Sequence, residues 1–338
     1  MKSLRFFDFF PPPHFLVMPA VGISIESTAL RVVSFENKHG TLVLKNADEI
    51  KLETGTIVAG DIAKPDKLIQ ILKDIRTKYS AGFVRVALPE EKAYTYETAI
   101  PIPEEGDLED AVEFSLDQNI PLTAAEAIFD FEIIEGPFLV NGVQSVRVAV
   151  SAYSKGLAES WVEVLKQARI TPLFFAAESQ AIAHSLVPRG DSQTALLVHF
   201  LKDKTVIAIC SNGVIRFTTT VLSSIENPEK ILAAHEGEKI AESVELLSVS
   251  DEVKKVFSYW SSRSGVKSKN DLSKIKTLIV SGYVADMSDV AEYLGKNIGV
   301  PARLGNVWTN AFSLDTVLPS ISFDHSLPFA AAVGVALP

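Results

Sequence analysis

The chain has 338 residues, of which 47% are hydrophobic, so it can bury a full core and has the length of about two ordinary domains. Its formal net charge of −10 argues against a nucleic-acid groove or a polybasic membrane anchor, because both need clustered lysine and arginine. The single cysteine, Cys210, excludes disulfides within the chain and lies in an apolar run, where we expect a buried thiol.

The N-terminal residues 1–20 are expected to form a tail outside the folded body. Three consecutive prolines interrupt the apolar run and Asp8 separates the phenylalanines, whereas a membrane span needs about 18 apolar residues. Two interpretations stay open. The tail packs its phenylalanines on the body, or it offers an aromatic and polyproline peptide to a partner.

Three strand-like runs follow the tail, "VGISIES", "ALRVVSFE" and "GTLVLKNADEIKLE". Pro65 then opens a predicted helix whose buried stripe is Leu68, Leu72, Ile75 and Tyr79. The run "FVRVALP" ends the unit as another strand. The order is therefore strand, strand, strand, helix, strand.

The second half of the chain repeats this design. Residues 194–223 predict three strands joined by the turns "LKDK" and "SNG", and residues 275–300 predict a strand, a turn and a helix. We therefore expect two lobes of related design, residues 21–190 and 191–338. The first contains an insert at 91–168, and the second contains a mostly polar, helical insert at 226–270.

The first insert has a pattern of its own. "DLEDAVEFSL" predicts a short amphipathic helix, and a proline-bounded turn leads into a strand. "SVRVAVSAY" predicts a second strand, and "KGLAESWVEVLKQARI" predicts a helix buried through Leu157, Trp161, Val164 and Ala168. We expect the surfaces of this helix–strand–strand–helix module to bind partners.

Several segments in this order resemble a known family. They are "EFSLDQNIPLTAAEAIFDFEII", with Ile120, Pro121 and Asp130, then the "ES" element at Glu178 and Ser179, and the ending "FAAAVGVAL". Together, from Val21 to Leu337, the chain resembles the PilM proteins of type IV pilus assembly. These are relatives of the cell-division protein FtsA in the actin, Hsp70 and sugar-kinase superfamily. The resemblance implies an α/β, actin-like, two-lobed fold in which residues 91–168 form an SHS2 or 1C module.

The resemblance also implies a function. A PilM-like protein is a cytoplasmic scaffold at the inner face of the cytoplasmic membrane, and it binds the short N-terminal peptide of a PilN-like bitopic membrane protein. A pilus motor ATPase is a second candidate partner. The resemblance implies no nucleic-acid partner, and membrane association only through partners.

Actin-like proteins grip nucleotide with two hairpins, each of which carries an aspartate for Mg²⁺ and a glycine for close phosphate approach. By the resemblance, the first hairpin of this chain keeps Gly22 and has Ser24 in place of the acid and Glu26 in place of the glycine. Ser27 and Thr28 remain as hydroxyl donors.

In the second hairpin, the resemblance places His199 and Leu201 at the expected aspartate and glycine. The adenosine-side turn keeps Ser281 and Gly282, and Tyr283 follows where another glycine is usual. A glutamate about 4 Å from a phosphate oxygen costs roughly 4 kcal/mol at an effective dielectric constant of about 20. We therefore expect a degenerate nucleotide cleft with no catalytic residues and no metal ligands, and with no cofactor or only weakly bound ATP and Mg²⁺.

Other side chains have two interpretations each. Lys202 and Lys204 are either solvated turn residues or phosphate-binding charges. Glu178 is either an acid favoured at a helix start or a group that positions water, and His199 is either a core residue or a base. The sequence favours the first interpretation in each case. The alternative function is an active, ATP-hydrolysing protein of the FtsA type, whose chains usually end in an amphipathic membrane helix not seen after "VGVALP".

Overall fold

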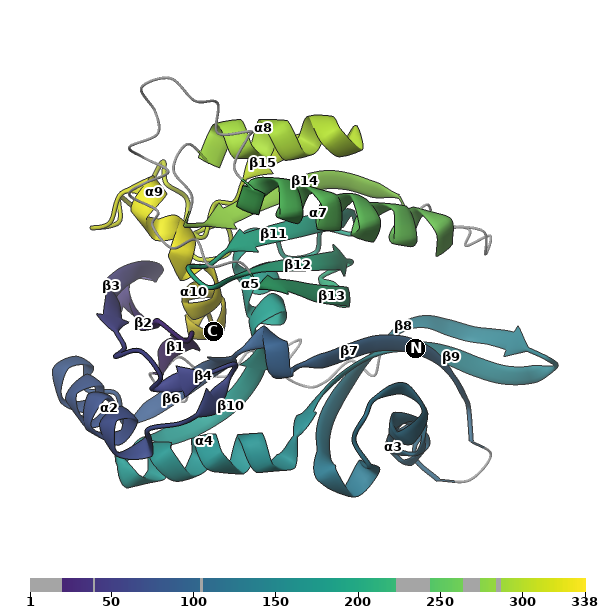
Figure 1. Ribbon diagram of the computed structural model, residues 1–338, viewed down its shortest axis with the longest axis horizontal. Coiled ribbons are helices and arrows are strands. Elements are labelled where there is room, and N and C mark those ends of the chain that lie inside the picture. Colours follow the sequence, from purple (N-terminus) through teal and green to yellow (C-terminus); the bar gives the residue numbers. More distant parts are fainter. Residues whose placement is uncertain (1–19, 39, 104–105, 223–243, 264–273, 284–286) are drawn as a thin grey trace.

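The computed structural model describes residues 20–38, 40–103, 106–222, 244–263, 274–283 and 287–338. The molecule has two lobes, with a smaller three-stranded module beside the first lobe (Figure 1). Residues 1–19 of the predicted tail, and residues 226–243 and 264–270 of the predicted second insert, lie outside the described ranges. Within those ranges, no helix is long and apolar enough to cross a membrane.

A five-stranded sheet in the order β10-β6-β1-β2-β3 forms the centre of the first lobe. Its strands are β1 (Val21–Ile25), β2 (Ala29–Lys38), β3 (Thr41–Lys51), β6 (Phe83–Leu88) and β10 (Thr171–Ala177). β1 is antiparallel to β2 and parallel to β6, and β6 is parallel to β10. A small hairpin, β4 (Ile57–Val58) and β5 (Asp61–Ile62), precedes the helix. The order predicted for the first half of the chain is confirmed.

Helices cover both faces of this sheet, and side chains on both faces are buried, as all five residues of β1 show. α2 (Pro65–Tyr79) and α4 (Lys155–Gln167) pack on one face, where Ile23 and Trp161 join a common core. α5 (Glu178–Leu186) and α10 (Ala330–Ala336) pack on the other face and lie between the lobes (Figure 1). α2 begins at Pro65 as predicted.

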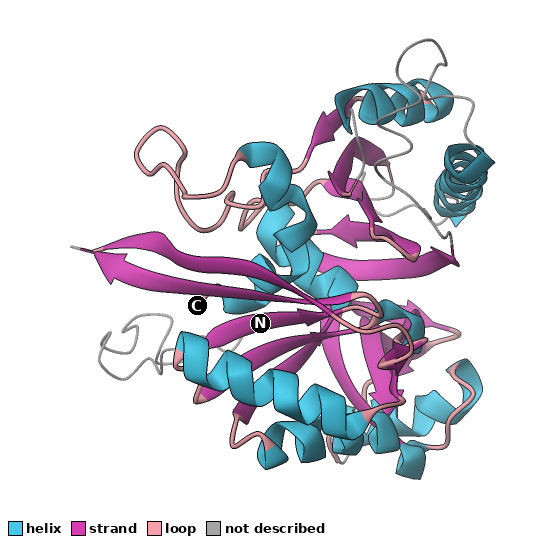
Figure 2. Cartoon of the chain, turned by 60° about the vertical axis from the view of Figure 1, so that its left-hand side comes forward, coloured by secondary structure: helices cyan, strands magenta, loops and turns pink. Residues whose placement is uncertain are grey.

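The second lobe has a sheet in the order β13-β12-β11-β14-β15. Its strands are β11 (Thr194–Phe200), β12 (Lys204–Ser211), β13 (Val214–Leu222), β14 (Ile275–Gly282) and β15 (Ala302–Leu304). The strands predicted for this half and the turns between β11, β12 and β13 are confirmed, and Cys210 is buried on β12 as expected. Residues 284–286 of the turn predicted after β14 lie outside the described ranges. Helices lie on the outer sides of both lobes and between them (Figure 2).

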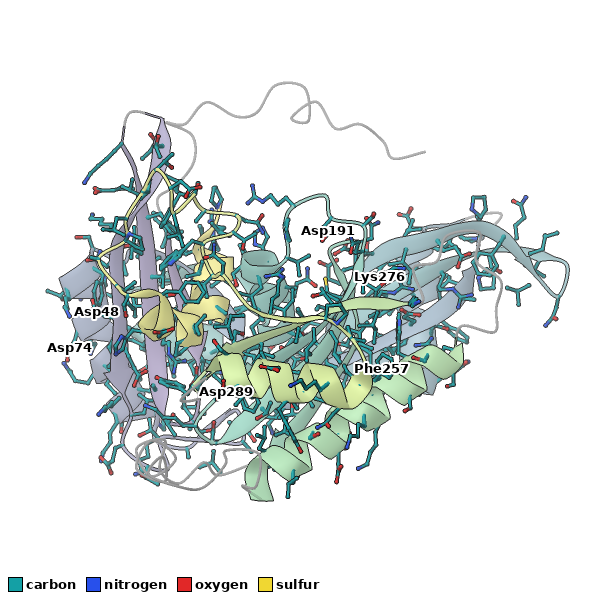
Figure 3. All side chains as sticks on the ribbon, turned by 90° about the horizontal axis from the view of Figure 1, so that it is seen from above. Asp48, Asp74, Asp191, Phe257, Lys276 and Asp289 are labelled. Atoms are coloured by element: carbon teal, nitrogen blue, oxygen red, sulfur yellow. The ribbon has the colours of Figure 1, made fainter. Side chains whose placement is uncertain are left out.

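α7 (Val244–Ser262) and α8 (Met287–Ile298) lie side by side over the second sheet, with Phe257 on the former and Asp289 on the latter (Figure 3). The sequence places α7 in a mostly polar insert. Its apolar face instead joins the core of the second lobe through residues such as Val253 and Trp260. The short helices α9 (Phe323–Ser326) and η7 (Leu327–Phe329) lead into α10.

The inserted module has its own sheet, in the order β7-β9-β8, and its own core. It consists of β7 (Tyr94–Pro101), α3 (Leu108–Asn119), η3 (Ala124–Glu126), β8 (Ala127–Val140) and β9 (Val143–Ser154), after η2 (Glu90–Lys92). The sequence misses β7, because nearly all of its side chains are half-buried and show no clear alternation. α4, expected as the last element of the insert, packs in the core of the first lobe instead.

Candidate functional site

The two hairpins at which the sequence places nucleotide contacts face each other between the lobes. Lys202, in the turn between β11 and β12, donates to Glu49 Oε1 on β3 over 2.9 Å. Tyr283 follows β14, and its ring centre lies 4.6 Å from Lys202 Nζ. Side chains of the second lobe therefore contact those of the first lobe at this cleft.

Arg31 lies at the centre of the first hairpin. It is opposite Ser24 in the β1–β2 ladder and is fully buried. Its guanidinium pairs with Glu26, lies 3.3 Å from Glu49 Oε2, and stacks on Tyr283 with Cζ 4.7 Å from the ring centre. Burial lowers the pKa of Arg31 to about 10, so the side chain stays charged at neutral pH. The Glu26 carboxylate thus has an internal cation.

The hydroxyl groups of this hairpin lie beside the ion pair. Ser24 is buried, and Ser27 and Thr28 are half-buried in the turn. Ser24 Oγ and Thr28 Oγ1 have no hydrogen-bond partner within the described part of the chain. The sequence analysis does not predict the role of Arg31 or its partners. The run "ALRVVSFE" could have indicated them, because an arginine in the middle of a buried strand needs acidic partners.

The environment of Lys204 differs from the one that the sequence favours. The sequence favours a solvated turn lysine, but the Lys204 side chain is only 1% exposed. Its Nζ bonds to Glu178 Oε2 over 2.8 Å and also pairs with Glu91. Although burial opposes the charge, these carboxylates raise the pKa of Lys204 above its usual range. Lys202 is about one-quarter exposed and pairs with Glu49, so it is not simply solvated either.

Glu178 is the first residue of α5, as the helix-start interpretation predicts. The carboxylate is fully buried. Burial raises its pKa to about 7, in spite of the nearby Lys204 ammonium, and the charges of Glu91 and Glu90 add to the rise. Glu90 accepts hydrogen bonds from Ser179 N at 2.8 Å and from Ser179 Oγ at 3.0 Å. Two carboxylates therefore contact the Lys204 ammonium, and that of Glu90 lies beside them.

His199 lies inside the second lobe on β11 and is 1% exposed. Its Nδ1 is 2.7 Å from Ser281 Oγ on the neighbouring strand β14. Burial, together with the positive charges of Arg31 and Lys204, lowers the pKa of His199 to about 3. The imidazole is therefore neutral at physiological pH and forms part of the core, as the favoured interpretation of the sequence expects.

Two glycines of the predicted site are required by the packing of the fold. A Cβ on Gly22 would lie 2.4 Å from the carbonyl oxygen of Ala332, on the helix that crosses behind the hairpin. Gly282 has φ +107°, and a Cβ there would lie 2.0 Å from the Phe200 carbonyl oxygen. The packing of the fold therefore explains why both positions are glycine, without any bound phosphate.

A separate groove lies where the module, the first lobe and the second lobe meet. Its volume is about 340 Å³, and its walls come from β8 and β9 of the module, β10 of the first lobe, and α5 and β13 (Figure 1). The floor includes the buried residues Leu88, Tyr153, Ala177 and Ile215. Phe174 is 46% exposed at the rim. The groove is therefore mainly apolar.

Two sheet edges border this groove. β10 is the last strand of the first sheet, and β8 is the last strand of the module sheet. Among the described strands, neither has a partner on its outer side. An edge strand presents unpaired backbone N–H and C=O groups, which can pair with an added strand. The geometry therefore suits an extended peptide with apolar side chains.

Two lobes around a cleft, each with a mixed five-stranded sheet, place this chain in the actin-like class of proteins, as predicted. The chain belongs to the PilM family. The model described as type IV pilus assembly protein PilM matches residues 22–242. The predicted family is thus confirmed. A search of curated proteins found no match.

One solved structure has the same fold, and two others are more distantly similar. One described as a PilM-PilN type IV pilus biogenesis complex is 18% identical, with a TM-score of 0.75 over 94% of this chain and 98% of that chain. The ethanolamine utilization protein EutJ of Carboxydothermus hydrogenoformans is 13% identical, with a TM-score of 0.47 over 97% and 90% of the chains. The cytoplasmic domain of EpsL, from the type II secretion system of Vibrio cholerae, is 10% identical, with a TM-score of 0.45 over 92% and 93%.

Proposed function

We propose that this chain is a scaffold that does not hydrolyse nucleotide, and that it captures the N-terminal peptide of a PilN-like bitopic membrane protein. The observation that carries the proposal is the apolar groove between the outer edges of β10 and β8. Membership of the PilM family and the likeness to a PilM-PilN complex support this class of partner. A pilus motor ATPase remains a second candidate partner.

Recruitment by such a peptide would hold the protein at the cytoplasmic face of the inner membrane. In this proposal the peptide lies extended in the groove, pairs its backbone with a free sheet edge, and places apolar side chains on the floor. Because a flexible peptide loses entropy when it becomes ordered, we expect micromolar affinity, about −8 kcal/mol.

The groove is tested by Phe174→Asp. This aromatic ring is 46% exposed at the groove rim, so its replacement should leave the core intact. The substitution would remove the apolar contact area of the ring and place a carboxylate beside the bound peptide. We expect the dissociation constant to rise by at least about tenfold, which is about 1.4 kcal/mol. Isothermal titration with synthetic N-terminal peptides of PilN-like bitopic proteins measures the change.

Leu318→Asp is the matched control, because Leu318 is 91% exposed and does not line the groove. It should bind the peptides as tightly as the wild type. If both variants bind equally well, the contact lies elsewhere on the molecule. If no peptide of such a partner binds the wild type, the FtsA-type alternative becomes the better hypothesis.

The side chains of the cleft between the lobes support the non-hydrolysing part of the proposal. Ser24 and His199 offer no carboxylate for the metal, and Glu26 is already paired with Arg31. In the described part of the chain, no group of three or more His, Cys, Asp or Glu is arranged to hold a metal ion. We therefore propose that the hairpins are remnants of a nucleotide site.

Purified protein should show no Mg²⁺-dependent ATP turnover above a boiled control. Any ATP binding measured by calorimetry should be weaker than micromolar, because the first hairpin has Ser24 and Glu26 where the resemblance expects an acid and a glycine. Turnover at an ordinary enzymatic rate of about 1 s⁻¹ would contradict the proposal.

A further inference from the structure

Lys204 joins three parts of the molecule. It is the first residue of β12, in the second lobe, and its ammonium is almost completely buried. It bonds to Glu178, at the start of α5, and to Glu91, in the turn η2 that leads from the first lobe into the module. One side chain of the second lobe therefore holds two segments that lie on the other side of the cleft.

The surrounding carboxylates are linked to one another. Glu90 N donates to Glu178 Oε2 over 3.3 Å, and the Glu90 carboxylate accepts two hydrogen bonds from Ser179. The turn η2 and the start of α5 are thus tied together around the ammonium. Without that cation, the buried Glu178 carboxyl, whose pKa is already raised to about 7, would either bind a proton or repel the carboxylates of Glu90 and Glu91.

This cluster lies directly behind the floor of the groove. Leu88 and Ala177 line the groove, and they come two residues before Glu90 and one residue before Glu178. Tyr153 also lines the groove, and its hydroxyl donates to the Leu88 carbonyl oxygen at 3.4 Å. Burial and the charges of Glu90 and Glu178 raise the pKa of Tyr153 well above its usual value, as expected for a phenol beside the cluster.

We propose that the Lys204 ammonium links the lobes without any bound nucleotide and thereby holds the groove floor in its binding geometry. Lys204 is a positioning residue in this account, since it does not line the groove itself. The part that concerns peptide affinity rests on the function proposed above. The part that concerns the lobes does not.

Lys204→Met keeps most of the side-chain volume and removes the charge. We expect peptide affinity to fall by at least about tenfold, because η2 and α5 move apart under the floor. Glu178→Gln in the Lys204→Met background should recover most of the loss, since it removes one of the repelling charges. A role limited to filling space would show no such recovery. Lys296→Met is the matched control, because Lys296 is an exposed lysine that pairs with Glu292 on its own helix and does not line the groove, and it should leave affinity within about threefold.

The position of the lobes is measured without any peptide. Spin labels on cysteines introduced at Asp74 of α2 and Lys255 of α7, both exposed, report the distance between the lobes, and the buried Cys210 should not react. Lys204→Met should broaden or lengthen this distance distribution, and the double variant should restore it. An unchanged distribution in folded Lys204→Met protein would overturn the proposal, even if no peptide binds the wild type. Added ATP and Mg²⁺ should change neither readout, and a narrowing caused by nucleotide would also overturn it.

Discussion

Replacing Arg31 by methionine should lower the free energy of unfolding by about 3–5 kcal/mol. Methionine fills much of the same space, but it leaves the Glu26 carboxylate, 1% exposed, without its paired cation. It also removes the contacts of the guanidinium with Glu49 and Tyr283. Urea unfolding followed by circular dichroism gives the change as a shift of the midpoint at constant slope.

A second variant separates the loss of charge pairing from the loss of packing. Arg31→Met together with Glu26→Leu replaces the buried pair by apolar groups, and such replacements are often neutral or stabilising. We expect this double variant to recover most of the stability that the single variant loses. If the single variant stays within about 1 kcal/mol of the wild type, the Glu26 carboxylate does not depend on Arg31 for its burial.

Most of the fold could be predicted because its elements have strong local patterns. The apolar stripe of α2, with Pro65 at its start, and the alternating runs of β1, β2 and β6 are visible in the sequence alone. β7 could not be found, because it lies between two other parts of the molecule and nearly all of its side chains are half-buried. The packing of α4 in the first lobe depends on a surface formed mainly by distant residues.

The site was less predictable, because its contacts join residues far apart in the chain. The places of His199 on a core strand and of Glu178 at a helix start could be predicted from single residues, because both have local explanations. The pairing of Lys202 with Glu49 spans 153 positions, and that of Lys204 with Glu91 spans 113. Nothing in "LKDK" shows that one of its lysines is buried, because burial depends on the approach of the other lobe.

At acid pH the His199 side chain is expected to destabilise the fold. Its pKa is about 3 in the folded protein, because of burial and the charges of Arg31 and Lys204, and about 6.5 in an unfolded chain. Below pH 6.5 the unfolded chain therefore binds a proton that the folded protein excludes. The contribution of neutral His199 to the free energy of unfolding is fully present above pH 6.5. It is lost as the pH falls toward 3, by about 1.4 kcal/mol for each pH unit.

The test compares urea unfolding of the wild type with that of His199→Asn, in steps from pH 7 to pH 4. The stability difference between the two proteins should shift in favour of the variant as the pH falls, by about 3 kcal/mol over this range.

The pKa shift of Glu178 acts on stability in the opposite direction. Its pKa is raised to about 7 by burial, so its contribution is present at low pH and lost as the pH rises through 7. Both proteins contain Glu178, so its effect cancels in the difference. A pH-independent difference between wild type and His199→Asn would mean that the folded protein accepts the proton, and that His199 is less isolated from solvent than its position on β11 requires.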